Sequence, residues 1–247
     1  MPLLMTLRRV VLGTGAAALA VWGFLGSSAA TEQAVQLPAP TLDAAPSLQS
    51  PQAATAATAT AIFAGGCFWG VQAVFQHTQG VLHAVSGYAG GASETASYAR
   101  IGSGRTGHAE AVQITYDPKL ISYGKLLQIY FSVAHDPTQL NRQGPDAGTQ
   151  YRSAVFYVDA GQKQIAERYI AQLGVAKLFP RKIVTQLTPL AAPLAFYRAE
   201  DNHQDYATRN PHSPYIVRFD QPKIAALKTL MPELYRAQPV LVSQSGS

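Results

Sequence analysis

The sequence contains one cysteine among its 247 residues, and only 13% of the residues are charged. A single thiol excludes an intramolecular disulfide and every zinc site that is built from several thiolates. The formal net charge is +5, from 19 basic and 14 acidic residues, and two of the arginines, Arg8 and Arg9, lie in a segment typical of a leader. Without them 17 basic residues remain against 14 acidic ones, and this modest excess does not indicate a nucleic-acid partner.

Residues 1–30 follow the three-part pattern of a secretory signal peptide. Two arginines and no acid precede an uncharged apolar run over 10–25, and small residues at 28–30 offer a cleavage site. The run is short for a membrane span, which needs about 20 apolar residues. We therefore predict export to the periplasm, with an uncleaved membrane anchor as the alternative.

The rest of the chain divides by composition. Residues 31–60 are rich in Ala, Pro and Thr and contain no aromatic or basic residue. Such a segment has little large apolar surface to offset the entropy of ordering, so we predict a linker. Residues 61–236 are long enough for one domain with its own core, and 237–247 form a short polar tail that we expect to be flexible.

Apolar periodicity predicts interleaved strands and helices within the domain. The predicted strands cover 61–64, 81–88, 109–116, 151–158 and 182–187, and the predicted helices cover 68–80, 121–134, 162–173, 200–208 and 223–235. Glycine-rich residues 90–107 indicate one long loop. This order predicts an α/β (α+β) domain, in which helices pack against one mixed β-sheet.

Cys67 lies at the predicted turn from the first strand into the first helix, directly after Gly65 and Gly66. Unpaired amides and the helix dipole favour an anion at such a position. We therefore expect this thiol to ionise more readily than a free cysteine and to act as a nucleophile. A solitary cysteine is often a small buried apolar residue instead, but the glycines and the adjacent aromatic pair favour chemistry.

Four motifs occur in order along the domain. They are Gly-Cys-Phe-Trp-Gly at 66–70, Gly-Tyr-Ala-Gly-Gly at 87–91, Thr-Gly-His-Ala-Glu at 106–110 and Gly-Thr-Gln-Tyr-Arg-Ser at 148–153. This set resembles the peptide methionine sulfoxide reductase A family, and the resemblance extends over residues 61–235. It implies reduction of methionine S-sulfoxide, free or in proteins, with no bound cofactor and no metal.

The resemblance implies a role for each matching residue. Cys67 attacks the sulfoxide sulfur, and Glu110 is the acid that protonates the departing oxygen, which requires a pKa raised by a poorly hydrated site. The phenols of Tyr98 and Tyr151 bind and polarise that oxygen. Asp146 belongs to the same polar cluster.

Two aromatic residues after the cysteine are implied to hold the substrate. Phe68 and Trp69 would form the hydrophobic pocket for its ε-methyl group. Because consecutive helical residues point to different faces, one of the two is free to pack in the core.

The chain departs from the family pattern in its cysteine count. Many members carry further cysteines near the C-terminus, or one in the loop before the glutamate, that attack the sulfenic acid on the first. Here residues 234–247 contain no thiol, and Gly102 and Ser103 occupy the loop position. Regeneration of Cys67 would therefore depend on an external thiol, thioredoxin or a similar reductant. We expect a monomer, because no feature demands more.

Two other functions stay open. A thiol hydrolase or transferase would pair Cys67 with His108 or His203, and an exported binding module would leave the thiol inert. A nucleotide site is not expected, because the Gly-x-Gly-x-x-Gly spacing at 102–107 precedes a strand pattern instead of a helix. The histidines also lack the spacing of a zinc site.

Overall fold

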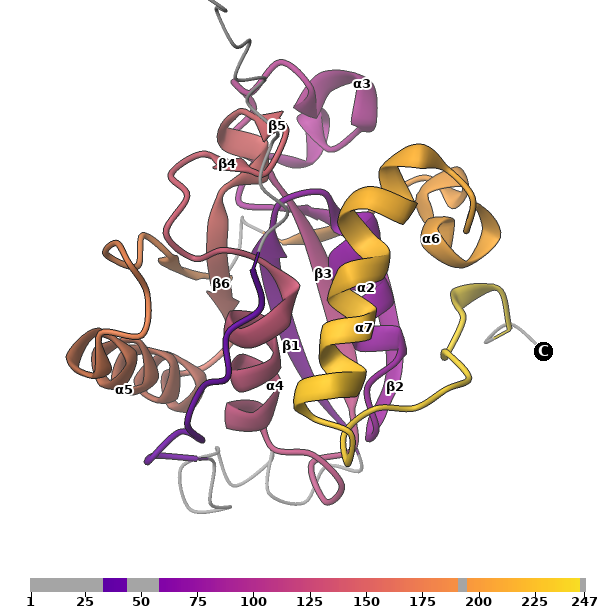
Figure 1. The fold of residues 1–247 in the computed structure, drawn as a ribbon. Helices are drawn as coiled ribbons and strands as arrows, with labels where there is room; N and C mark the ends of the chain where they lie inside the picture. The colour runs from indigo at the N-terminus through magenta and orange to yellow at the C-terminus, as the bar shows by residue number, and fades with distance from the viewer. Residues whose placement is uncertain (1–32, 44–57, 191–194, 245–247) are drawn as a thin grey trace, which may run out of the picture.

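A six-stranded sheet forms the centre of the computed structural model, which describes residues 33–43, 58–190 and 195–244 (Figure 1). The predicted signal peptide, 1–30, lies outside the described residues. The sheet order is β7-β6-β1-β3-β2-β8, antiparallel throughout except between β6 and β7. Its strands are β1 (Ala59–Gly65), β2 (Val81–Ala89), β3 (Ala109–Tyr116), β6 (Ser153–Tyr157), β7 (Gln186–Pro189) and β8 (Phe196–Arg198). The predicted mixed sheet is confirmed.

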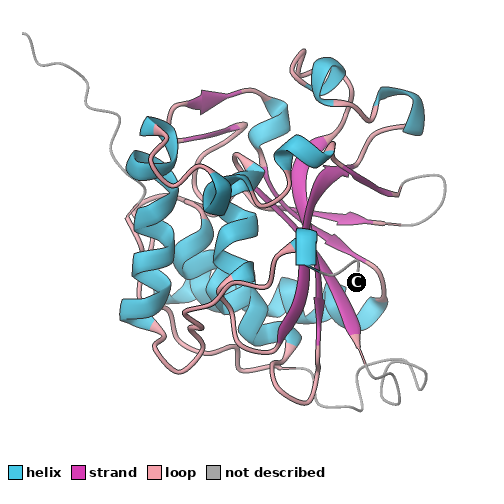
Figure 2. Cartoon of the chain, turned by 90° about the vertical axis from the view of Figure 1, so that its right-hand side faces the viewer, coloured by secondary structure: helices cyan, strands magenta, loops and turns pink. Residues whose placement is uncertain are grey.

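Most of the described helices cover one side of this sheet (Figure 2). They are α2 (Phe68–Gln76), α3 (Tyr98–Ile101), α4 (Tyr123–Ile129), α5 (Ala160–Ala176), α6 (Tyr206–Arg209) and α7 (Gln221–Leu230). None of these described helices is long and apolar enough to cross a bilayer. The predicted α/β class, with helices packed on the sheet, is therefore confirmed.

The alternation of side chains along β1 builds a core on each face of the sheet. Ala61 and Phe63 face the main core, where the Phe63 ring lies 5.6 Å from that of Phe75 on α2. Ile62 and Ala64 face a smaller cluster, which contains mainly alanines of the neighbouring strands. Because both faces are covered, the central strand is a continuous apolar run instead of an alternating one.

Short elements differ from the predicted ones. The expected loop 90–107 contains a 3-10 turn and α3, and the helix expected over 200–208 divides into a 3-10 turn and α6. Neither β8 nor the two-stranded ladder of β4 (Arg142–Gln143) and β5 (Asp146–Ala147) was predicted. Elements of two to four residues carry too few side chains for a periodic pattern, and their pairing partners are distant in sequence.

Part of the predicted linker lies against the domain. Leu37 is 2% exposed within the main core, and its carbonyl accepts from the Gln128 side chain of α4 at 2.7 Å. The Asp43 carboxylate accepts from the Ser122 hydroxyl at 2.6 Å and from the Gly124 amide at 3.0 Å. Leu37, the smaller contacts of Ala34, Val35 and Leu42 with the main core, and hydrogen bonds from the domain thus order residues 33–43.

The tail is also attached where the structure describes it. The backbone amides of Val242 and Ser243 each donate to the Asp205 carboxylate at 3.0 Å. The Val240 amide donates to the carbonyl of Gln76, at the end of α2. We expected a flexible tail from the polar composition of these residues. Composition does not indicate which backbone amides find a hydrogen-bond acceptor in the domain.

Candidate active site

Cys67 lies where β1 ends and α2 begins, which is the predicted strand-to-helix turn. Gly66 makes this turn possible, because its φ is +87° and an added Cβ would lie 2.5 Å from the Gln143 side chain. Cys67 is partly exposed as a residue. A left-handed turn and a close neighbour therefore both require glycine beside this cysteine.

Glu110 points from β3 to the first turn of α2. It lies on the same face of β3 as Val112, which packs in the main core, and its side chain is only 2% exposed. One carboxyl oxygen accepts from the backbone amide of Phe68 at 3.0 Å. Burial raises the pKa of Glu110 to about 8, with a smaller rise from Asp146 and an opposing effect of the Phe68 amide. A carboxyl group is thus held in its protonated form near neutral pH, and it is bonded to the residue that follows Cys67.

The same surroundings raise the pKa of the Cys67 thiol well above its ordinary value. Burial is the main cause, and the charge of Glu110 is the next. Asp220 and Asp146 add to the rise, whereas the backbone amide of Trp69 opposes it. The expectation that the helix N-terminus makes this thiol ionise readily is therefore wrong for the unliganded site. Burial and the charges of the nearby carboxylates, which raise the pKa of the thiol, outweigh the backbone amide that lowers it. No cation is among the groups that act on this pKa.

Tyr98 and Tyr151 approach this site from two different segments. Tyr98 begins α3, and Tyr151 ends a 3-10 turn before β6. Burial raises the pKa of both phenols, and the charges of Glu110 and Cys67 raise each of them further. Glu200 positions the first segment, since it accepts from the Tyr98 amide at 3.0 Å. The two neutral hydroxyls therefore lie close enough to the thiol and the buried carboxyl for their charges to interact.

The loop at 102–107 connects these two segments. The Thr149 hydroxyl donates to the Gly104 carbonyl at 2.6 Å, and the Arg152 guanidinium donates to the Gly107 carbonyl at 2.9 Å. The loop then enters β3 directly, without a helix after it. The loop therefore holds the segments of Thr149 and Arg152 against the start of β3.

Asp146 has a partner that the sequence did not single out. The Tyr215 hydroxyl donates a hydrogen bond to the Asp146 carboxylate. Burial raises the pKa of Asp146, while Tyr215 and Lys223 lower it. Together with Cys67 and Gln143, these three residues line one small cavity. Tyr215 is one of 12 tyrosines and lies in none of the four motifs, so no sequence signal distinguished it.

Phe68 and Trp69 have different environments. Phe68 is 1% exposed, and its ring packs 6.0 Å from Tyr88. Trp69 is only half-buried, stacks on Tyr206 at 3.8 Å and meets the Tyr215 ring edge-on at 5.9 Å. Of the two aromatics implied to hold the methyl group, Trp69 is the one that belongs to an aromatic group at the cavity, and Phe68 packs in the core.

Both histidines of the hydrolase hypothesis are engaged elsewhere. The ring of His108 accepts from the Gly91 amide at 3.2 Å through one nitrogen and lies 3.0 Å from the Ala92 carbonyl through the other. His203 accepts from the Trp69 indole at 3.3 Å, and burial lowers its pKa. Neither geometry presents a base to Cys67, so the arrangement favours chemistry with a carboxylic acid. The described residues also contain no cluster of His, Cys, Asp and Glu that could hold a metal ion.

Comparisons with known proteins identify the family of the chain. The model of the family "Peptide methionine sulfoxide reductase" matches residues 59–233. Peptide methionine sulfoxide reductase MsrA 2 of Mesorhizobium japonicum is 61% identical over 188 residues, which are 76% of this chain and 95% of that protein. The MsrA 2 protein of Synechocystis is 49% identical over 181 residues, 73% of this chain and 83% of its own.

Solved structures give the same result. Methionine sulfoxide reductase A of Corynebacterium diphtheriae aligns with a TM-score of 0.54 at 33% identity, covering 75% of this chain and 89% of that one. Reduced Mxr1 from Saccharomyces cerevisiae aligns with a TM-score of 0.54 at 32% identity, covering 64% and 89%. The chain belongs to the peptide methionine sulfoxide reductase A family.

Proposed function

We propose that the chain reduces the S epimer of methionine sulfoxide, free or in proteins, with Cys67 as nucleophile and Glu110 as acid. The observation that carries the proposal is the buried Glu110 carboxyl, which is bonded to the Phe68 amide and protonated near neutral pH. A sulfoxide oxygen does not leave as an oxide anion, so an acid must supply its proton as the sulfur is attacked. A carboxylic acid of raised pKa beside a thiol meets this requirement.

The net step conserves atoms and electrons. Glu110 protonates the sulfoxide oxygen and recovers a proton from the thiol, and the Cys67 sulfur attacks the sulfoxide sulfur. When Glu110 donates its proton again, the S–O bond breaks, the oxygen leaves as water, and an S–S bond joins Cys67 to a sulfonium. Water then attacks the Cys67 sulfur, breaks the S–S bond and returns a proton to Glu110. The products are the thioether of methionine and a sulfenic acid on Cys67, so the cysteine is oxidised by two electrons and the methionine is reduced by two. Tyr98 and Tyr151 donate to the oxygen without adding a competing charge. Trp69, whose ring meets that of the cavity residue Tyr215 edge-on, contacts the methyl group of the substrate.

The second half of the cycle requires electrons from outside these 247 residues, because Cys67 is the one cysteine in the sequence. An external thiol attacks the sulfenic sulfur and releases water, and a second thiol then releases Cys67 from the mixed disulfide. We propose thioredoxin or a similar dithiol protein as the reductant. Cys67 is partly exposed as a residue at the turn before α2, and such a partner can approach it there.

The test gives the full chain each epimer of methionine sulfoxide, as the free amino acid and within a peptide, together with dithiothreitol. We expect loss of the S epimer only, and no loss with Cys67→Ser. Ser103→Ala, which changes a surface loop residue, is the matched control and should retain activity. Consumption of neither epimer by the parent chain would overturn the proposal, and thiol-dependent ester hydrolysis in its place would favour the hydrolase.

We also propose export to the periplasm, on the basis of residues 1–30 alone. The test is N-terminal sequencing of the chain from fractionated cells. Cleavage near residues 28–30 in the periplasmic fraction supports export, an intact N-terminus in the membrane fraction supports the anchored alternative, and recovery from the cytoplasm contradicts both.

A further inference from the structure

A second hollow, of about 450 Å³, lies between the C-terminal end of α5 and the loop that leads to β7. None of its lining residues lines the cavity at Cys67, and in Figure 1 α4 lies between α5 and α2. Pockets that enclose small molecules have volumes of roughly 300–1,000 Å³ and mostly apolar walls. The hollow is therefore large enough for a ligand of its own.

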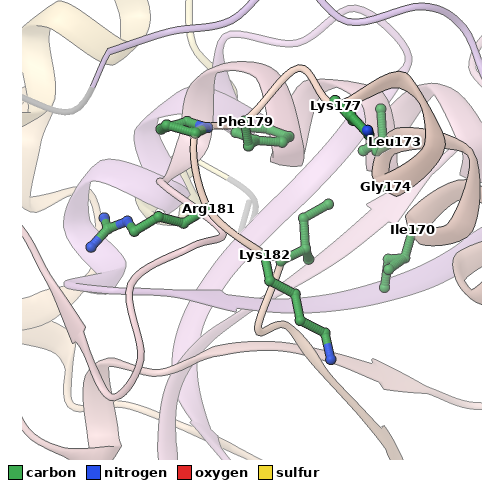
Figure 3. A pocket seen from close by; sticks show the side chains of 9 residues that line it. Ile170, Leu173, Gly174, Lys177, Phe179, Arg181 and Lys182 are labelled. Atoms are coloured by element: carbon green, nitrogen blue, oxygen red, sulfur yellow. The ribbon is translucent and has the colours of Figure 1, made fainter.

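Its walls are apolar and come from two segments. Ile170 and Leu173 extend from α5 toward the loop that carries Phe179 (Figure 3). Leu173 is 1% exposed, while Ile170, Phe179 and Ile183 pack against the main core with part of each side chain uncovered. Partly uncovered apolar side chains that face one another across a hollow favour an apolar occupant.

The entrance to the hollow is positively charged. Lys177, Arg181 and Lys182 line it, and residues 168–199 contain no Asp or Glu. Arg181 extends away from the helix in Figure 3 and lies 3.6 Å from the Asp136 carboxylate. Among the described carboxylates none forms an ion pair with Lys177 or Lys182. Two exposed ammonium groups are thus available to an anion at the mouth of an apolar space.

We propose that this hollow binds a single-chain amphiphilic anion, a medium-length alkyl chain that ends in a carboxylate or a phosphate. The alkyl chain lies between the partly uncovered side chains of Ile170 and Phe179, and the anionic group contacts Lys177 and Lys182. A free monomer fits this geometry better than a bilayer does, because the apolar surface lies inside a hollow and the cations lie at its mouth. The acyl chains of a bilayer stay packed against one another, so a protein that binds a bilayer must project its apolar surface outward to reach them.

The test titrates the full chain with octanoate, decanoate and decanol as monomers in isothermal calorimetry. Each CH₂ group moved out of water should tighten the Kd about fourfold, so decanoate should bind roughly 15-fold more tightly than octanoate. Decanol, which lacks the charge, should bind about fivefold more weakly than decanoate. One saturable site is expected.

Two variants locate the site. Gly174 lines the hollow on α5, and an added Cβ there meets no atom within 4 Å, so Gly174→Leu should fold, fill the space and abolish binding. Ala171→Leu, on the exposed side of the same helix, is the matched control and should bind normally. The double variant Lys177→Asn, Lys182→Gln should lower the affinity for decanoate to that for decanol.

The control for charge is Lys119→Gln with Lys228→Gln, two exposed lysines outside the hollow, which should leave the affinity unchanged. Unchanged decanoate binding by Gly174→Leu would overturn the proposal, as would equal losses in the two lysine pairs. Binding to phosphatidylglycerol vesicles without binding of monomeric decanoate would also contradict it, because the partner would then be a membrane surface.

Discussion

Replacing Glu110 with glutamine should make the protein more stable and much less active. Burial raises the pKa of this carboxyl from 4.5 to about 8. A carboxyl with a raised pKa in the folded state binds its proton more tightly there than in the unfolded chain. Its full contribution to stability is therefore present below pH 4.5, and stability falls as the pH rises from 4.5 to 8.

The magnitude at pH 7 follows from this shift. Between pH 4.5 and pH 7 the carboxyl loses its proton in the unfolded chain and mostly keeps it in the folded one. This difference lowers the free energy of unfolding by about 1.4 kcal/mol per pH unit, or about 3 kcal/mol in all. Glutamine is neutral at every pH and its carbonyl can still accept from the Phe68 amide. Glu110→Gln should therefore gain up to about 3 kcal/mol in free energy of unfolding at pH 7, and its stability should no longer fall between pH 5 and pH 8.

Activity should change in the opposite direction. At pH 7 about 90% of Glu110 is protonated, and at pH 9 about 10% is, so kcat/KM of the parent should fall about tenfold per pH unit above pH 8. An amide cannot transfer a proton, and removal of a general acid costs roughly 10²- to 10⁴-fold in rate. Glu110→Gln should lose that factor and the decline above pH 8 with it.

Urea denaturation from pH 5 to pH 9 and rapid-quench measurement of methionine formation in a single turnover are the two assays. A single turnover avoids the thiol reductant, whose own ionisation would add a pH dependence. Glu94→Gln, which changes a fully exposed glutamate, is the control and should alter neither profile. A variant that is less stable than the parent at pH 7, or one that keeps the activity within tenfold, would refute the reasoning.

Three further substitutions probe the surroundings of the site. Tyr215→Phe removes the hydrogen bond to Asp146, so the pKa of that carboxyl should rise further and kcat/KM with dithiothreitol should fall about tenfold; an unchanged kcat/KM would contradict a role for the pair. Gly66→Ala places a Cβ 2.5 Å from Gln143 at a φ of +87° and should cost more than about 1 kcal/mol of stability in urea denaturation; a stability equal to that of the parent would contradict the need for glycine at this turn. Leu37→Ala should cost about 2–4 kcal/mol, and a smaller loss than 1 kcal/mol would show that residues 33–43 do not belong to the folded unit.

Long apolar elements of the fold were predictable from sequence because their periodicity is local. The strand predicted over 109–116 coincides with β3, and the helix predicted over 162–173 lies within α5. Burial of 33–43 was not predictable, because its apolar residues pack on a core built from distant segments, and its carbonyls accept from side chains of α4 and α5 that are more than 80 residues away. Average composition carries no information about such specific partners.

The residues of the site were predictable where a motif contains them, and their electrostatics were not. Gly66 and Cys67 occupy the turn that their motif indicated, and the sequence also indicated that Glu110 needed a poorly hydrated environment. The predicted direction of the thiol's pKa shift was wrong, because local reasoning counted the helix amides and omitted the burial of the thiol and the carboxylates of Glu110 and Asp220 from distant segments. The partner of Asp146 was missed for the same reason.

Burial explains how one environment can serve both groups of the proposed reaction. It keeps Glu110 protonated, as an acid must be, and it keeps the Cys67 thiol protonated as well. Thiolates, and not thiols, are oxidised by peroxides. A resting site with a neutral thiol therefore resists oxidation in the absence of substrate, which matters for a chain whose sequence holds no second cysteine to trap the sulfenic acid. When a sulfoxide binds, its oxygen accepts the proton of Glu110, the thiol can pass its own proton to that carboxylate, and the nucleophile forms only where its target is already in place.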